Sequence, residues 1–204
     1  MTRSGSSRLL PVVITGTAVL CLLCGCAANR DTGAAPSASE LPNWVRVVPR
    51  TADGKAFYVG GCSAAESAEA GVAKAEADAL SQIEAEARKH FREIIMAARR
   101  GSDIEVTSTN QAKLWGAGGD LLSQKLLESA TREQVYHEEC GGPGSGAACR
   151  IFVLLTVDLE LWDATVIKAL EALGANAREE RRPEIGQLAE FAARHYERKA
   201  RAKP

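Results

Sequence analysis

The sequence is poor in histidine and in aromatic residues, and it has no large excess of charge of either sign. Its 204 residues include three His, three Trp, three Tyr and four Phe, and its acidic and basic residues nearly balance, with a formal net charge of −1. Without a basic excess, the chain lacks the electrostatic footprint of a nucleic-acid-binding protein. It also lacks the HExxH motif of zinc hydrolases and the GxSxG elbow of serine hydrolases.

The sequence contains no apolar run as long as a membrane-spanning helix. The longest, residues 9–23, has 15 residues, whereas a span needs about 20. Arg3 and Arg8 precede this run, and a basic start before a short apolar segment is typical of a secretory signal peptide. The segment ends in Leu23-Cys24-Gly25-Cys26, which resembles a bacterial lipobox with Cys24 at a position usually held by Ala, Ser, Thr or Val. The alternatives are an uncleaved anchor and a plain signal peptide.

The lipobox resemblance implies that Cys26 is lipidated and becomes the N-terminus of the mature protein. Lipoproteins of this class carry three acyl chains such as palmitate, and stable anchoring needs at least two chains. Ala27 stands where Asp would retain such a protein in the inner membrane. We therefore expect a lipid-anchored protein of the outer membrane that faces the periplasm.

Three cysteines follow the lipobox, and they lack the paired CxxC spacing of a zinc site. Cys140 and Cys149 flank a glycine-rich turn, so in an oxidising compartment they are candidates for a disulfide. The alternative is two reduced thiols. Cys62 is expected to be a small buried apolar side chain.

The whole chain divides by composition into four segments. Residues 1–25 are the signal peptide, and residues 26–41 comprise Cys26 and a small, polar, disordered tether. Residues 42–174 form an α+β domain, and residues 175–204 form a charged C-terminal helix. Removal of residues 1–25 leaves 179 residues with 23 basic and 26 acidic side chains, a size that suits one domain.

The first half of the domain predicts a strand followed by a long helix. The aromatic and β-branched residues of 57–62 are typical of a strand. Ser63 is the expected N-cap of the helix, with Glu66 completing a capping box. Apolar residues, mostly alanine, then recur at three- and four-residue steps up to about Arg100, and Gly101 is the expected C-cap. Alanine in this stripe allows the helix to approach its partner surface closely.

The second half predicts two strands and two further helices. Residues 103–109 fit either a strand or an extended connection, and residues 116–119 (GAGG) are expected to break the chain before a short helix over 121–130, capped by Asp120. Strands are expected over 131–139 and 150–158. The latter is apolar on both faces, so we expect the long helix on one face and either the following helix or a second copy on the other. A helix over 161–173 should end at Gly174, and another should begin at Pro183.

Several short segments resemble the LPP-twenty-like family of twenty-kilodalton bacterial lipoproteins. They are Pro42 with Trp44, residues 59–61 (VGG), the helix over 64–87 and residues 152–157 (FVLLTV), in that order after a lipobox and a tether. The resemblance covers about residues 42–170. It implies a dodecin-like α+β fold, in which a long helix packs on a small three-stranded antiparallel sheet in the order strand, helix, strand, strand. Residues 116–130 and the helices near the C-terminus depart from that pattern.

The chemistry-bearing side chains suggest no active site. His90 is expected at the surface, His137 with Glu138 and Glu139 reads as a polar sheet face, and a deep pocket joining Cys62 to His137 would be needed for an enzyme. We therefore predict no catalytic residue, no metal site and no cofactor. The basic end of the chain is read as a solvated helix end, with contact to an anionic polymer or lipid as the alternative.

The resulting hypothesis is a structural or protein-interaction role in the cell envelope, exerted through a protein partner or a homo-oligomer. A flagellar or other envelope assembly is one setting for such a role. Phe152 and Leu154, on the second face of the last strand, are the candidate contact surface. The alternative is a periplasmic small-ligand-binding module formed by a homo-oligomer, which a cluster of Trp or Tyr in one cavity would favour. No nucleic-acid partner is expected.

Overall fold

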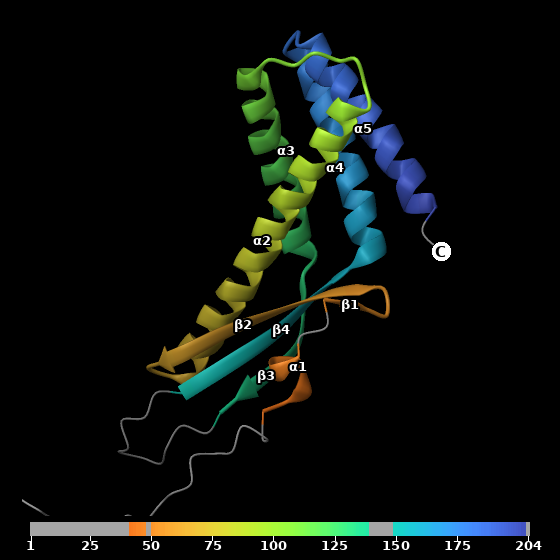
Figure 1. Cartoon of the computed structure of the whole chain (residues 1–204). Coiled ribbons are helices and arrows are strands. Elements are labelled where there is room, and N and C mark those ends of the chain that lie inside the picture. Colours follow the sequence, from red (N-terminus) through yellow and green to blue (C-terminus); the bar gives the residue numbers. More distant parts are fainter. Residues whose placement is uncertain (1–40, 48–49, 139–148, 203–204) are drawn as a thin grey trace, which may run out of the picture. The chain divides into compact units, whose positions relative to one another are not determined.

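The computed structural model describes residues 41–47, 50–138 and 149–202, which all belong to one compact unit (Figure 1). The unit is of the α+β class, as predicted. Its elements, in chain order, are α1 (Asn43–Arg46), β1 (Thr51–Ala52), β2 (Lys55–Ala65), α2 (Ala68–Arg100), α3 (Ser108–Ser129), β3 (Thr131–His137), β4 (Cys149–Asp158), α4 (Leu159–Glu179) and α5 (Pro183–Arg201).

The sheet has four antiparallel strands in the order β1-β2-β4-β3, rather than the predicted three. The additional strand, β1, has only two residues and joins β2 through Asp53-Gly54. Both turn residues have positive φ (49° and 74°), which is the geometry of the tight hairpin turn that an Asp-Gly pair favours. A two-residue strand carries no alternating pattern, so this strand was not predicted.

The long helix α2 lies on one face of the sheet at very short range. A Cβ atom added to Gly60 of β2 would lie 1.9 Å from the carbonyl oxygen of Ala75, and one added to Gly71 would lie 2.3 Å from Ile151 Cδ1. Ala75 and Ala79 are fully buried. The expected close approach of the alanine stripe is therefore confirmed, and it depends on glycine in both elements.

The ends of α2 correct one prediction and confirm another. Its N-cap is Ser67, whose hydroxyl accepts a hydrogen bond from Ala70 N at 3.2 Å, and not Ser63. Strand β2 continues past a bulge to Ala65, where it pairs with Cys149, so Ser63 lies within the strand. Gly101 is the C-cap, as expected.

The predicted break at residues 116–119 was wrong, because these residues lie inside the continuous helix α3. Thr107, not Asp120, is the N-cap of that helix. A Cβ atom on Gly118 would lie 2.1 Å from Phe91 Cζ, and one on Gly119 would lie 3.3 Å from Arg88 Cγ. These glycines therefore allow α3 to pack closely on α2, which compensates for their low helix propensity.

Helix α4 likewise continues through Gly174, the predicted end, and reaches Glu179. Gly174 faces Gly186 of α5, and a Cβ atom added to either glycine would lie within 4 Å of the carbonyl oxygen of the other. The α5 helix begins at Pro183, as expected. Helices α3, α4 and α5 pack with α2 into a bundle whose core includes Phe91, Leu122, Leu170 and Leu188.

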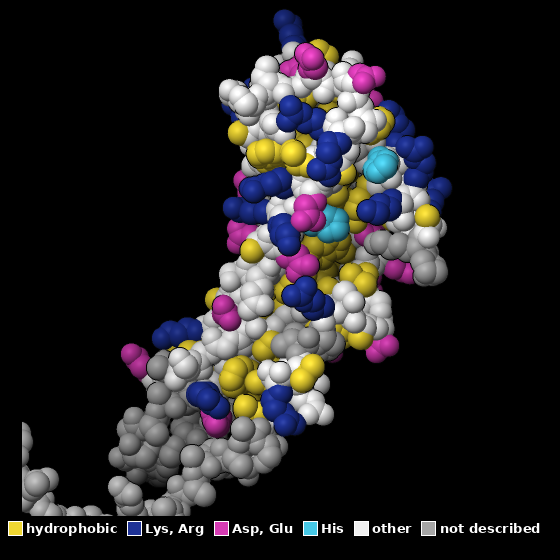
Figure 2. Space-filling view, in the orientation of Figure 1, with side chains coloured by type: hydrophobic (Ala, Val, Ile, Leu, Met, Phe, Trp, Pro, Cys, Tyr) yellow, Lys and Arg dark blue, Asp and Glu magenta, His cyan; other side chains and the backbone are white. Residues whose placement is uncertain are grey.

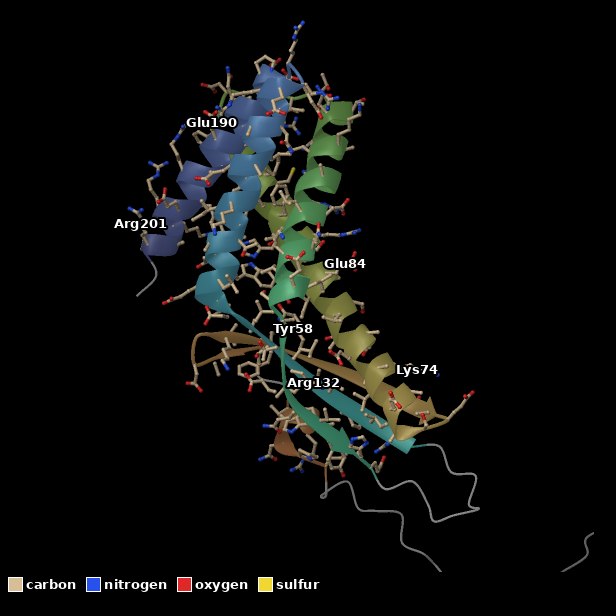
Figure 3. All side chains as sticks on the ribbon, turned by 180° about the vertical axis from the view of Figure 1, so that it is seen from behind. Tyr58, Lys74, Glu84, Arg132, Glu190 and Arg201 are labelled. Atoms are coloured by element: carbon tan, nitrogen blue, oxygen red, sulfur yellow. The ribbon has the colours of Figure 1, made fainter. Side chains whose placement is uncertain are left out.

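The last strand, β4, is covered by α2 on one face only. Ile151, Val153, Leu155 and Val157 face α2 and are at most 1% exposed. Helix α4 does not cover the second face, because it packs mainly on α5 and α3. Both ribbon views place α1 on the side of the sheet away from α2 (Figures 1 and 3). Among the helices in the described ranges, none is long and apolar enough to cross a membrane.

Candidate functional site

An open cleft of about 930 Å³ lies where the sheet meets the helical bundle. Its walls come from β1 and β2, the middle of α2 and the first turn of α4. In the space-filling view, recessed apolar side chains lie beside α2 and are rimmed by charged ones (Figure 2). The residues that line the cleft are Arg50, Thr51, Ala56, Phe57, Tyr58, Val59, Gln82, Ala85, Glu86, Lys89, His90, Glu93, Leu159, Trp162 and Asp163.

Two aromatic side chains from distant segments form the floor of this cleft. Tyr58 and Trp162 are each only 5% exposed. Tyr58 faces α2 because alternate residues of β2 point to that side. Trp162 lies in the first turn of α4, which is fixed by Asp158: the Asp158 carboxylate accepts a hydrogen bond from Leu161 N at 3.0 Å. Strand geometry and a helix cap therefore bring the two rings into one cleft.

Tyr58 interacts with a carboxylate at the edge of the cleft. Burial raises the pKa of the Tyr58 hydroxyl well above its ordinary value, and the negative charge of Glu86 and a hydrogen bond with that side chain raise it further. The hydroxyl therefore stays protonated and acts as a donor over the physiological pH range. Glu86 is itself exposed, so its charge remains available to the cleft.

A second tyrosine and carboxylate lie beside Trp162. The Tyr196 hydroxyl of α5 donates a hydrogen bond to Asp163 Oδ1 at 2.5 Å, and burial together with Asp163 raises the Tyr196 pKa. The ring of His90 lies between the two aromatic residues, 6.0 Å from the Trp162 ring and 5.7 Å from the Tyr196 ring. His90 is thus half-buried in an aromatic cluster, and the prediction of a surface histidine was wrong.

One face of α2 supplies the polar wall of the cleft. Gln82, Glu86, Lys89 and Glu93 recur at three- and four-residue steps, which places them along one side of a helix. The Lys89 ammonium lies 4.0 Å from the Glu93 carboxylate. The cleft lining contains three carboxylates, two cationic side chains and one histidine.

Side chains of α2 also occupy the edge of β2 next to the cleft. Gln82 Nε2 donates to the carbonyl oxygen of Val59 at 2.9 Å, and Asp78 Oδ2 accepts from Gly61 N at 3.0 Å. Phe57 N donates to the carbonyl oxygen of Arg50 at 3.2 Å. Pairing of an additional strand at this part of β2 would have to displace these hydrogen bonds.

The predicted contact residues lie on the other face of the sheet. The Phe152 ring lies over Gly61, where an added Cβ atom would be 3.3 Å from Phe152 Cε1, and 6.5 Å from the Tyr136 ring. Phe152 is half-buried, whereas Leu154 is only 4% exposed. Of the two, Phe152 therefore offers the larger accessible surface.

The other residues singled out from the sequence contribute nothing to the cleft. Cys26, Cys140, Glu139 and the turn between Cys140 and Cys149 lie outside the described residues, so the predicted lipidation and disulfide stay predictions. We expected Cys62 to be buried, but it is only half-buried against the core. Cys62 and His137 pair with Ile151 from opposite sides, and neither lines the cleft.

Sequence reasoning missed the cleft because its residues looked ordinary one at a time. Glu86 and the neighbouring charges fit the solvated face of a helix, and Trp162 fits the apolar stripe of another. The available signal was the regular spacing of Gln82, Glu86, Lys89 and Glu93, but only the fold places Tyr58 and Trp162 opposite that face.

Within the described ranges, no group of three or more His, Cys, Asp or Glu side chains is placed to hold a metal ion. Comparisons with models of protein families, with curated proteins and with solved structures found no match to this chain. The arrangement of the cleft itself, with aromatic rings at its floor and charged groups at its rim, suits noncovalent binding of a ligand that is part apolar and part charged.

Proposed function

We propose that this chain is a lipoprotein of the bacterial outer membrane, related to the LPP-twenty-like family, and that it acts in the envelope by binding rather than by catalysis. The lipobox-like sequence that ends at Cys26 is the observation that carries the proposal, and the short polar segment after it suits a tether. The strand, helix, strand, strand order of β2, α2, β3 and β4, with α3 inserted before β3, supports the family relationship.

Replacement of the lipidated cysteine tests the anchor. Cys26→Ala removes the only thiol to which the lipobox would direct acyl chains. We expect the wild-type protein in the membrane fraction and the variant in soluble fractions, or retained as unprocessed precursor. Cys62→Ala is the matched control, because it removes a thiol outside the lipobox. A fully processed Cys26→Ala variant that stays in the membrane would refute the proposal.

A structural or interaction role of the anchored domain has a separate test. Phe152 is the accessible member of the proposed contact surface, so Phe152→Glu should reduce crosslinking to a partner or to a second copy in intact cells. Val135, 36% exposed on the other face of the sheet, provides the control variant Val135→Glu. Thermal unfolding of both variants separates loss of a contact from loss of the fold, and equal crosslinking in the two would argue against this surface.

The cleft supports small-ligand binding as a second candidate function. The predicted sign of such a function was a cluster of Trp or Tyr in one cavity, and Tyr58 and Trp162 form such a pair within a single chain. This differs from the expected site between subunits of a homo-oligomer. A screen of small molecules by their effect on the thermal midpoint tests it, because a ligand that binds only the folded state raises that midpoint.

A further inference from the structure

We propose that the short helix α1, together with Val47, docks into the head-group region of the membrane that holds the acyl chains of Cys26. This inference rests on the lipid anchor proposed above and adds a second contact with the same membrane. Its basis is an exposed apolar segment at the point where the tether enters the fold.

The residues in and around α1 are apolar and basic. Residues 41–50 contain one Trp, three Val and two Arg, and neither Asp nor Glu. Tryptophan favours the boundary between lipid and water because its ring is apolar and its N–H group is polar. Apolar side chains next to basic ones are typical of segments that lie in the membrane interface.

The fold leaves the apolar side chains of this segment accessible. Helix α1 has no buried residue. Val47, its C-cap, is 74% exposed, the largest exposed fraction of any large hydrophobic side chain in the part of the chain that the structure describes. Trp44 and Val45 are half-buried. Transfer of these side chains from water into the head-group region removes apolar surface from water, which is favourable.

The charge beside these side chains suits an anionic lipid surface. Arg46 is exposed, and its Nη2 donates to Asn43 Oδ1 at 2.7 Å, so the guanidinium is held on α1 itself. A basic side chain near an anionic membrane is attracted to its head groups. Arg50 is not counted here, because it lines the cleft together with three carboxylates. The apolar side chains therefore carry the inference, and Arg46 adds to it.

The length of the tether determines which part of the domain meets the lipid. Residues 27–42, 16 in number, separate Cys26 from α1, and their composition predicts a flexible chain. Such a chain spans about 20 Å root-mean-square. The turn between α4 and α5 lies at the other end of the molecule from α1 (Figure 1). The anchor therefore gives α1, and not the bundle end, a high effective concentration at the membrane.

Quenching by spin-labelled lipid tests the inference on the full-length, acylated protein in vesicles of phosphatidylcholine and phosphatidylglycerol. An environment-sensitive dye is attached to Val47→Cys or, as the matched control, to Gln187→Cys, an exposed position in the first half of α5. Wild-type protein labelled in the same way gives the background from its own thiols. Doxyl-labelled phosphatidylcholine should remove most of the emission of the dye at residue 47 and leave the dye at residue 187 unchanged, because a nitroxide quenches only at short range.

A change of charge separates docking from mere proximity to the membrane. In the labelled Val47→Cys protein, Arg46→Glu should shift the equilibrium away from the docked state about fivefold, a change of about 1 kcal/mol, because a carboxylate is repelled by phosphatidylglycerol. Arg198→Glu is the matched control, since it makes the same charge change on an exposed residue of α5. It should leave the quenching unchanged. Thermal unfolding of both variants verifies that the fold is intact.

The outcomes separate this inference from the anchor on which it rests. Flotation of the vesicles shows whether the protein is bound to them. A bound protein whose dye at residue 47 is not quenched overturns the docking of α1 and leaves the anchor in place. Equal quenching at residues 47 and 187 also overturns it, because the domain then has no preferred side toward the lipid. A protein that does not float with the vesicles overturns both.

Discussion

The two halves of α2 bury different kinds of side chain. Toward the sheet, the buried positions are Gly71, Ala75 and Ala79, and the helix backbone nearly touches Gly60 of β2. Toward the bundle, they include Ile83, Phe91 and Ile95, and the small residue lies on the partner helix instead. At the sheet end, small residues of α2 therefore pack against the strands, Ala75 on Gly60 and Gly71 on Ile151, whereas at the bundle end the large Phe91 ring of α2 packs on a glycine of α3.

Phe91→Ala should have the largest effect on the bundle end. The Phe91 ring is fully buried against Gly118, so its removal should lower the free energy of unfolding by about 4 kcal/mol through lost burial and the cavity that remains. Urea unfolding followed by circular dichroism measures this loss.

Gly118→Ala sharpens the test, because its Cβ atom would meet the Phe91 ring at 2.1 Å. Alone, it should cost about 2 kcal/mol as overpacking. When Gly118→Ala is combined with Phe91→Ala, the added methyl group has room. The loss of unfolding free energy in this double variant should therefore be smaller than the sum of the two single losses by about 1 kcal/mol or more. Simple additivity would mean that the ring and the glycine are not packed as described.

Gly60→Ala should have the next largest effect, at the sheet end. The added Cβ atom would lie 1.9 Å from the Ala75 carbonyl oxygen and 2.6 Å from Ala79 N, so α2 itself must move. We expect a loss of about 3 kcal/mol, the upper part of the range for overpacked cores. Because the site lies far along α2 from Phe91, the losses from Gly60→Ala and Phe91→Ala should add, and strong coupling between them would contradict the separation into two ends.

Raising the pH should destabilise the region where the sheet meets the helical bundle. Burial raises the pKa of Tyr58 and of Tyr196, so both hydroxyls stay protonated in the folded state after they ionise in the unfolded chain. Their contribution is complete below the unfolded tyrosine pKa of about 10, and stability should fall above it by up to about 1.4 kcal/mol per pH unit for each group. Urea unfolding between about pH 9 and pH 11 measures this slope, and Tyr196→Phe should reduce it, whereas an unchanged slope would exclude Tyr196 as a source.

Gly116→Ala should have the smallest effect, and the opposite sign. Nothing lies within 4 Å of a Cβ atom at this position, although it is only two residues from Gly118 in the same helix. Alanine should therefore stabilise the protein by up to about 1 kcal/mol through helix propensity. A loss of stability would show that the exposed side of α3 has a contact that the described residues do not account for.

The sequence predicted those elements whose signals are local and periodic. The strands predicted over 57–62 and 150–158 lie within β2 and β4, and the helix capped by Gly101 and the helix that begins at Pro183 are also present. All four were predicted from alternation, apolar spacing and caps. The breaks expected at residues 116–119 and at Gly174 were wrong for one reason. A glycine read alone signals a turn, whereas these glycines serve a contact with another helix that no local pattern shows.

The candidate site was hidden for the related reason that its parts are distant in the chain. Tyr58 and Trp162 are about 100 residues apart, and each fits a local pattern that has no need of the other. Only the pairing of β2 with β4, from whose end α4 begins, brings them to the same side of α2. The predicted strands and helices indicated the α+β class correctly but carried no information on where Tyr58 and Trp162 meet.

The continuity of α2 also affects how the protein unfolds. Its 33 residues extend for about 50 Å at 1.5 Å per residue, and they supply one wall to the sheet core and another to the bundle core. Fraying of α2 from one end would expose the apolar side chains of the neighbouring core, and neither the sheet nor the helical hairpin of α4 and α5 would keep its main cover. Slow amide protons should therefore be spread over both ends of the molecule and exchange through the same global opening, as in a single cooperative unit.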